Sequence, residues 1–415
     1  MKIYQESILK NNLSVITIED KNSETVAATM WISAGSRYEN PNEYGLAHVL
    51  EHVLLKETRK HSLDQIGTLV DRKGAYLNAY TSVESISVRV QSSKNHSEEM
   101  LNILAEIITQ PLFNTQTIEK EKNIILEELA SFKDSKNKRI GSELMRLVFD
   151  KHPLSQTPIG TETCIKNITA TQLQKYYNAY ITPNRSVFIV SGNITHEEVV
   201  RFAQKNFTED WNNAADGVKN DFETPSPQKR SEKIFIEETG NQTKLFFNFL
   251  CPNVGLEELV ILELIANSIG YGKVPILKEE LRHKEGLIYT IGVAISKFRD
   301  ASLLHISTAT TKPKEVLEGI GNVLSKIGTL YEDEQKLIDF KEQFKEVLLR
   351  KFTNQSQEME LLWILKKLTG KMIQPQEIME IIDSVKNDDI QKTIEKFLSS
   401  ENLLIIAFGE KNPFE

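Results

Sequence analysis

One order of strands and helices occurs twice in this 415-residue chain, and this repeat constrains the fold more than any other feature of the sequence. In each half, alternating apolar residues indicate strands, and apolar residues at helical spacing indicate two helices after them. The segments of the first half are residues 76–81, 85–91, 97–109 and 117–133. Those of the second half are residues 286–292, 303–307, 313–330 and 333–350. We therefore expect an α+β fold of two duplicated α/β sandwich domains, each a mainly antiparallel sheet with helices packed on one face.

A change of composition separates the two halves. Residues 208–231 are rich in Asn, Asp, Lys, Ser and Pro and have almost no periodic apolar residues, which is typical of a linker. The sequence thus predicts a first domain at residues 1–207, a linker at residues 208–231 and a second domain at residues 232–415. A chain of 415 residues is long enough for each domain to bury its own core.

The first half contains the motif His48-Val49-Leu50-Glu51-His52 within a segment of apolar residues at helical spacing. Residues four apart lie one turn above each other on an α-helix, so both imidazoles project from one face, which Glu51 shares. Two neutral imidazoles are suitable zinc ligands, and a carboxylate beside them is suitable as a general base. The pattern H-x-x-E-H reverses the commoner H-E-x-x-H zinc signature. The second half has no such motif at the matching place, so we expect only the first half to bind metal.

A catalytic zinc site needs a third protein ligand, and a Glu-rich helix is the candidate to provide it. Glu121 and Glu128 are seven residues apart, hence two turns apart on one face, and neighbouring apolar residues can pack that helix down. Glu128 is then a candidate ligand, and Glu121 can hydrogen-bond a ligand imidazole. Spacing alone does not separate Glu127 from Glu128, and a helix rich in Glu and Lys is also typical of a solvated surface.

The charge and composition exclude some classes of function. The formal net charge is −8, and no run of Lys and Arg is interleaved with aromatic residues, so we expect no nucleic-acid partner. No stretch approaches about 18 consecutive apolar residues, so we expect no membrane span. The first residues lack the apolar core of a signal peptide, and Cys164 and Cys251 favour two free thiols, which together indicate a cytoplasmic protein.

Three motifs together resemble the pitrilysin/insulinase family of zinc metallopeptidases. They are residues Gly45–His52, residues Leu77–Thr81, and the pair Glu121 and Glu128. Within that family the chain is most similar to the two-domain members related to the mitochondrial processing peptidase. Residues 158–161 and 180–192 also fit, so the resemblance covers essentially the whole chain.

The resemblance implies a role for each residue of the metal motifs. His48, His52 and Glu128 match the ligands of one Zn²⁺ per chain. Glu51 matches the general base, and Glu121 matches the acid that supports a ligand.

The resemblance also implies where a substrate binds. Arg282 and Tyr289 match a pair in the second domain that contacts the substrate carbonyl and steadies the oxyanion. The strand along which the family binds an extended peptide matches Asn78, Ala79, Tyr80 and Thr81.

The expected function is therefore that of a zinc metallopeptidase, an endopeptidase or oligopeptidase acting on peptides or unfolded polypeptides. Because one chain has both the metal domain and the Arg/Tyr domain, we expect a homodimer in which each metal site is completed by the second domain of the partner. The alternative is a non-catalytic or regulatory peptide-binding subunit of a peptidase heterodimer.

Overall fold

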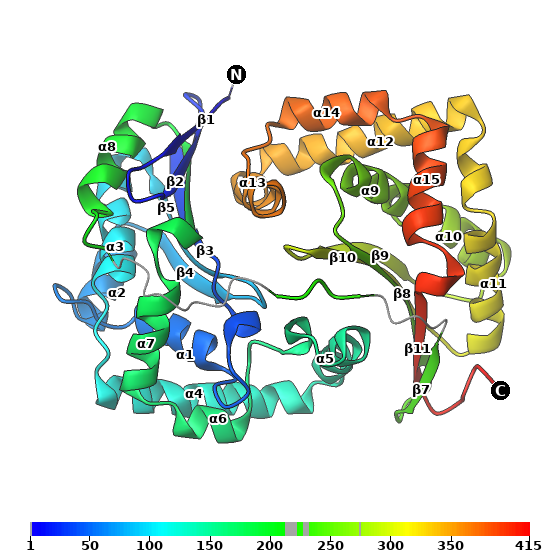
Figure 1. Cartoon of the computed structure of the whole chain (residues 1–415), viewed down its shortest axis with the longest axis horizontal. Coiled ribbons are helices and arrows are strands. Elements are labelled where there is room, and N and C mark those ends of the chain that lie inside the picture. The colour runs from blue at the N-terminus through cyan, green and yellow to red at the C-terminus, as the bar shows by residue number, and fades with distance from the viewer. Residues whose placement is uncertain (1, 212–221, 227–231, 274) are drawn as a thin grey trace. The chain divides into compact units, whose positions relative to one another are not determined.

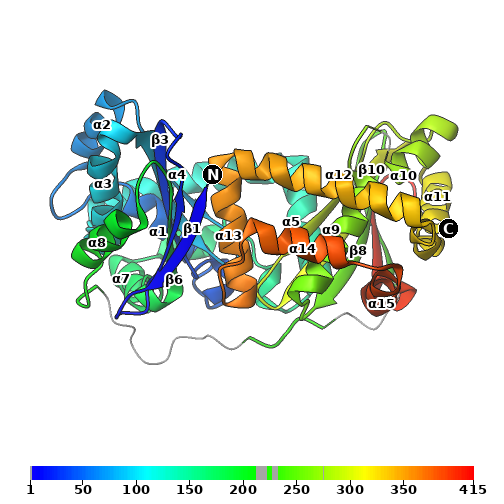
Figure 2. The same cartoon turned by 90° about the horizontal axis from the view of Figure 1, so that it is seen from above.

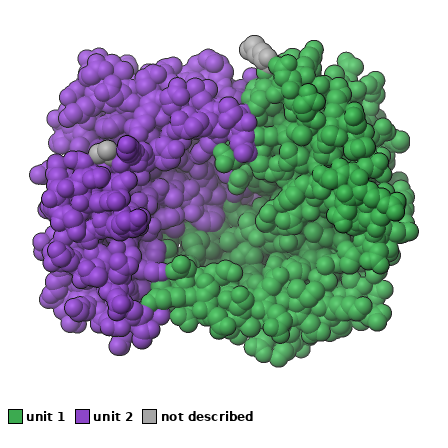
Figure 3. Space-filling view, turned by 180° about the vertical axis from the view of Figure 1, so that it is seen from behind, with its two compact units in different colours: residues 1–222, 355–363 green, residues 223–354, 364–415 purple. Residues whose placement is uncertain are grey.

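The chain folds into two compact units, each built on one sheet. The computed structural model describes residues 2–211, 222–226, 232–273 and 275–415. Unit 1 comprises residues 1–222 and 355–363, and unit 2 comprises residues 223–354 and 364–415 (Figure 3). Much of the expected linker, residues 212–221 and 227–231, lies outside the described residues. Both units combine strands with helices (Figure 1), so the expected α+β class is confirmed.

The sheet of unit 1 has its described strands in the order β1-β2-β6-β3-β5-β4. Their bounds are β1 (Ile3–Ile8), β2 (Ser14–Glu19), β3 (Thr25–Ile32), β4 (Tyr76–Thr81), β5 (Ile86–Ser93) and β6 (Ser186–Gly192). β2 and β6 pair in parallel, and the other neighbours pair antiparallel. β4 thus forms one edge of the sheet, where one side of its backbone has no strand partner within the described chain.

Eight α-helices of unit 1 lie between β3 and β7 (Lys233–Glu237) in the described chain. They are α1 (Leu46–Leu54), α2 (Leu63–Arg72), α3 (Ser97–Thr109), α4 (Thr115–Asp134), α5 (Lys136–Phe149), α6 (Glu162–Asn167), α7 (Ala170–Tyr180) and α8 (His196–Asn206). Most of them gather on one face of the sheet, whereas α5 contacts α4 and stands apart from that layer (Figure 1). β5 shows the two faces clearly, because Ile86, Val88 and Val90 are buried in the core while Arg89 and Gln91 alternate with them on the other face. The same core contains apolar residues of α1, so the metal motif lies on the helix-covered face.

Unit 2 repeats the sheet of unit 1 without its first strand. The described strands are β7 (Lys233–Glu237), β8 (Thr243–Pro252), β9 (Ile291–Lys297), β10 (Ala301–Thr310) and β11 (Leu403–Gly409), in the order β7-β11-β8-β10-β9. This order matches β2-β6-β3-β5-β4, and the parallel pair β7 and β11 matches the parallel pair β2 and β6. The expected duplication is therefore confirmed at the level of strand order and direction.

The helices of unit 2 include the counterpart of α1. They are α9 (Leu256–Gly270), α10 (Ile276–Lys278), α11 (Pro313–Ser325), α12 (Glu334–Thr353), α14 (Pro375–Ser384) and α15 (Asn387–Phe397), and α12 packs beside α14 (Figure 2). α9 follows β8 as α1 follows β3, yet its sequence contains no His. Among the described helices of either unit, none is both long and apolar enough to cross a membrane.

Two expected segments of unit 2 end or begin elsewhere. Residues 286–292 were expected to be strand, but β9 begins at Ile291. Gly286 has a φ of 62°, and the backbone N–H groups of Gly286 and Leu287 donate to Arg282 and Leu281, so the chain first completes a turn. The helix expected over residues 313–330 ends at Ser325, and Gly328–Tyr331 forms a separate 3₁₀ turn.

Helix α13 (Gln355–Thr369) is divided between the units, and its first nine residues, 355–363, belong to unit 1. The side chain of Gln355 donates to the backbone oxygen of Ser191 in β6 at 2.7 Å, and Ser356 accepts from Arg89 in β5. The ring of Trp363 stacks on Trp31 of β3 with 6.2 Å between centroids. These residues cover part of the sheet face that lies opposite the helix layer.

The anchor of this segment is Glu358, whose side chain is fully buried. Its two oxygens accept from the hydroxyl of Tyr4 at 2.5 Å and pair with the ammonium of Lys2 at 2.6 Å. Burial and the Glu358 carboxylate both raise the pKa of Tyr4, so its hydroxyl stays protonated and donates.

We expect Glu358→Ala to lower the free energy of unfolding by about 2 kcal/mol, because it removes the acceptor of both groups from a buried position. Urea unfolding followed by circular dichroism measures the loss. Glu346→Ala removes an exposed carboxylate from α12 and serves as the control, with little expected effect. Equal stability of the two variants would show that Glu358 does not anchor the segment.

Candidate metal site

Helix α1 holds the histidine motif in place from its first turn. Gly45 precedes the helix with a φ of 100° and has no side chain to accept from the exposed N–H groups there. The buried carboxyl group of Glu39 replaces that cap, accepting from the N–H groups of Gly45 at 2.9 Å and Ala47 at 2.7 Å. Gly160 packs so close to Gly45 that a Cβ on Gly160 would lie 2.5 Å from the Cα of Gly45. These contacts fix the start of the helix that presents both histidines.

His48, His52 and Glu128 converge at one point. One oxygen of Glu128 lies 3.7 Å from Nε2 of His48 and 3.7 Å from Nε2 of His52. Tetrahedral zinc with bonds of about 2.1 Å places its ligand atoms about 3.4 Å apart, so the three side chains fit a zinc ion. Among the described residues these three form the one group of candidate metal ligands of this kind. A fourth position remains for water or substrate, as in catalytic sites.

The histidines are suited to bind a cation. Burial, and then the neighbouring His52, lower the pKa of His48 to about 4, so its imidazole is neutral at pH 7. A neutral imidazole keeps a lone pair for a metal. The two rings lie 4.8 Å apart and nearly perpendicular, so they approach a shared point from two directions.

Helix α4 supplies the carboxylates. Its buried Ile125 and Leu129 pack it against the core, and this places Glu128, rather than the adjacent Glu127, beside the histidines. Glu121 lies two turns earlier and is buried, with one oxygen 3.1 Å from Nδ1 of His52. That contact holds the proton on Nδ1 and leaves Nε2 free to bind a metal.

Lys56 is a residue of this site that the sequence analysis did not identify. Its ammonium lies 3.1 Å from the other oxygen of Glu121, so a positive charge compensates the buried carboxylate. Lys56 follows His52 by four residues, which is the same helical spacing that relates His52 to His48. Glu39 was missed as well, and no periodicity in the sequence marks it.

Glu51 lies near the metal ligands and near the end of strand β4. Burial is the largest cause that raises its pKa, while Thr81, through its side chain and backbone, and His52 lower it. The Glu128 carboxylate raises it further. A carboxylate with a raised pKa accepts a proton more readily than an ordinary one, as a general base beside a metal site must.

The predicted substrate strand is the edge strand β4, which packs against α1. Ala79 is buried, Thr81 is next to Glu51, and Asn78 and Tyr80 lie on the opposite face. The free edge of β4 thus begins beside the candidate catalytic carboxylate.

Arg282 and Tyr289 lie in unit 2, and the structure brings these two residues together. Arg282 belongs to a π-helical turn, Glu279–Lys284, and its guanidinium carbon lies 4.9 Å from the centre of the Tyr289 ring. The Tyr289 side chain is 74% exposed, so its hydroxyl is available to a ligand.

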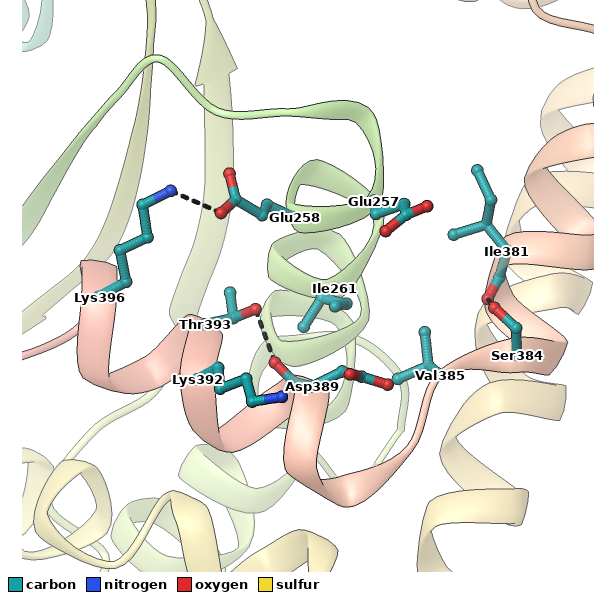
Figure 4. A pocket seen from close by; sticks show the side chains of 10 residues that line it. All are labelled: Glu257, Glu258, Ile261, Ile381, Ser384, Val385, Asp389, Lys392, Thr393 and Lys396. Atoms are coloured by element: carbon teal, nitrogen blue, oxygen red, sulfur yellow. Dashed lines mark hydrogen bonds and ion pairs between the residues drawn. The ribbon is translucent and has the colours of Figure 1, made fainter.

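A small cavity elsewhere in unit 2 has a different character. It has a volume of about 270 Å³ and lies among α9, α14 and α15 (Figure 4). Lys396 pairs with Glu258 at 2.6 Å, and Glu258 also accepts from the N–H of Gly255 at the start of α9. These contacts stabilise the N-terminus of α9. Among the described residues that line the cavity there is no His or Cys, so the histidine site of unit 1 remains the candidate active site.

Comparison with known proteins places this geometry in a family. The family model of insulinase, peptidase family M16, matches residues 14–162, and the model of the peptidase M16 inactive domain matches residues 167–342. A protein of Rickettsia felis named as an uncharacterized zinc protease is 30% identical over 95% of both chains. The chain therefore belongs to the M16 family of peptidases, and the expected family is confirmed.

Other relatives cover nearly the whole chain. The mitochondrial-processing peptidase subunit beta of Neurospora crassa is 26% identical over 98% of this chain and 87% of its own length. A protease from Helicobacter pylori has the same fold, with a TM-score of 0.89 over 98% of this chain and 99% of its own, at 18% identity. The two-unit fold is thus shared along its full length.

The pH dependence of stability tests the role of Glu39. Burial, which outweighs the helix N–H groups, raises the pKa of Glu39 from 4.5 to about 8. The folded state then binds this proton more tightly, so the contribution to stability is full below pH 4.5 and is lost as the pH rises to about 8. We expect the unfolding free energy of the metal-free protein to fall more across this window than that of Glu39→Gln, in urea titrations at several pH values. Parallel curves for the two proteins would contradict this assignment.

Proposed function

We propose that this chain is a zinc-dependent peptidase that hydrolyses peptide bonds, with Glu51 as the general base. The observation that supports this most directly is the convergence of His48, His52 and Glu128 with Glu51 beside them. Three protein ligands and one open position are typical of catalytic zinc, whereas structural zinc usually has four protein ligands. The names of the relatives, zinc protease and mitochondrial-processing peptidase, agree with this proposal.

When bound, zinc supplies a Lewis acid that acidifies water and polarises a carbonyl. The residues of the chain carry out the remaining steps. Glu51 accepts the proton of the attacking water and returns it to the leaving amine. Glu121 holds the tautomer of His52 through Nδ1, and β4 binds the peptide backbone along its free edge.

The Arg282 and Tyr289 pair is proposed to stabilise the negative charge on the carbonyl oxygen. A single well-placed donor of this kind is worth about 3 kcal/mol in a transition state. The Arg282 guanidinium packs over the Tyr289 ring and thereby orients the exposed Tyr289 hydroxyl. An exposed and oriented hydroxyl can donate a hydrogen bond to the carbonyl oxygen of a substrate. We propose that the pair of one subunit serves the metal site of another in a homodimer.

The alternative function is a non-catalytic or regulatory peptide-binding subunit of a heterodimer. Such a chain could lack a ligand or the base without loss of function. Here all three candidate ligands and Glu51 are present and close together, which favours catalysis.

Replacing Glu51 with Gln is expected to lower the cleavage rate about 10²- to 10⁴-fold, because the base is lost while the ligands remain. Digestion of a peptide mixture by the purified protein, with and without a chelator and read by mass spectrometry, measures the rate. Zinc content by atomic emission is expected to stay near one per chain.

Glu127→Gln is the matched control, since Glu127 is an exposed carboxylate on α4 next to the candidate ligand. It is expected to cleave like the unaltered protein. Cleavage by Glu51→Gln at the control rate would remove Glu51 from the mechanism, and chelator-insensitive cleavage would remove the metal.

Mixing two inactive variants tests the proposed division of the site between subunits. Glu51→Gln is defective in unit 1 and Tyr289→Phe in unit 2, so a mixed dimer keeps one intact site only if each site is shared in trans. After exchange of subunits, about half of the dimers are mixed and the mixture is expected to regain about a quarter of the normal activity. Activity equal to the mean of the two variants, or a monomeric mass by light scattering, would contradict the homodimer.

A further inference from the structure

Strand β4 presents two different faces along its free edge. Its pairing with β5 places Leu77 opposite Val90 and Ala79 opposite Val88, on the core face that packs against α1. The intervening residues of β4 therefore face away from the metal helix. These residues are Tyr76, Asn78 and Tyr80.

Two tyrosines dominate the outer face. Tyr76 and Tyr80 are 42% and 58% exposed, and their hydroxyl oxygens lie 3.3 Å apart. The amide of Asn78 donates to the hydroxyl of Tyr76 at 3.2 Å, so the three side chains form one connected surface. We call Tyr76, Asn78 and Tyr80 the tyrosine ledge. Its exposed rings are held in place before any ligand arrives.

The ledge begins beside the proposed reaction centre. Thr81 is the residue of β4 that interacts with Glu51, and Tyr80 precedes it directly. A strand that pairs with β4 keeps a one-to-one register with it. A substrate residue opposite Tyr80 therefore lies next to the bond that Glu51 serves, and the residue opposite Tyr76 lies four positions further along the substrate.

We propose that the tyrosine ledge selects substrates with large apolar side chains, aromatic ones above all, at two positions four residues apart. This inference rests on the proposed peptidase function and on β4 as its substrate strand. A side chain directly opposite on a neighbouring strand has its Cβ about 5 Å away, close enough for an aromatic or β-branched residue to pack on a tyrosine ring. Substrate residues opposite Leu77, Ala79 and Thr81 point toward the other side of the sheet, where α1 packs, and do not contact the ledge.

The charge near the ledge decides between apolar and basic side chains. Tyrosine rings also attract Lys and Arg. However, Arg89 lies opposite Asn78 on β5. The hydrogen bond with Tyr80 is the main cause that lowers the pKa of Tyr76, and the charge of Arg89 adds to it. In Tyr80 the hydrogen bond with Tyr76 raises the pKa, and Arg89 acts in the opposite direction. A second cation on the ledge would meet this guanidinium, whose charge Glu360 offsets only in part, so apolar side chains are favoured.

Digestion of a library of unstructured peptides, read by mass spectrometry with a chelator-treated control, tests the inference. The unaltered protein is expected to favour aromatic residues at one position next to the cleaved bond and at a second position four residues away. Tyr80→Ala is expected to reduce the first preference about two- to fivefold and to leave the second, because one cross-strand pair is lost. Tyr76→Ala is expected to do the reverse.

Phenylalanine variants and a distant tyrosine provide the controls. Tyr80→Phe and Tyr76→Phe keep the ring and are expected to keep the preferences. Tyr271→Ala removes an exposed tyrosine of unit 2 and is expected to change neither. If the unaltered protein cleaves but shows no such spacing, or if each alanine variant changes both preferences equally, the ledge does not select substrates. Absence of chelator-sensitive cleavage would instead overturn the proposed function.

Discussion

The contact between Glu121 and His52 joins the two helices on which the candidate metal site depends. Helix α1 carries the histidines, α4 carries the carboxylates, and the 3.1 Å contact fixes one helix against the other. A buried carboxylate without compensation would be costly. Lys56 provides the opposite charge from the chain just after α1, so the same short segment presents the candidate ligand His52 and neutralises Glu121, which orients it. With the two helices held together in this way, Glu128 lies two turns further along α4, where its carboxylate reaches the imidazole rings of both histidines.

The parts of the site that follow from local geometry could be predicted from the sequence. A spacing of four residues placed His48 and His52 on one face of a helix, and the structure has them there. Spacing left Glu127 and Glu128 open, and the assignment of Glu128 came from the family resemblance, because the packing of α4 decides between them and spacing does not contain it. Helix α9 gave no amphipathic signal because apolar residues occur around most of its circumference, and its buried residues occupy nearly every position from 259 to 269. The docking of residues 355–363 on the sheet of unit 1 depends on contacts more than 150 residues apart in sequence, and no local pattern encodes it.

The two duplicated units have similar folds but different side chains at matching places. The sheets share strand order and the position of their single parallel pair, and α1 and α9 occupy matching places. α1 has polar residues at three positions of an otherwise apolar helix, whereas α9 buries mainly Leu, Ile and Val, with Asn267 and Ser268 near its end. Burying imidazoles costs free energy that apolar residues do not cost. A second metal motif in α9 would therefore lower the stability of unit 2. If one reaction centre is enough, apolar residues in α9 make unit 2 more stable.

Burial shifts the proton affinities of two groups in the candidate site in opposite directions. It lowers the pKa of His48, which keeps that ligand neutral, and it raises the pKa of Glu51, which makes that carboxylate a stronger base. One apolar environment thus prepares both a candidate ligand and the proposed base. A bound cation lowers the pKa of a neighbouring carboxylate, so metal binding moves the pKa of Glu51 back toward its ordinary value. The rise caused by burial opposes that shift, so in its proposed role Glu51 is a better proton acceptor than an exposed carboxylate beside the same cation would be.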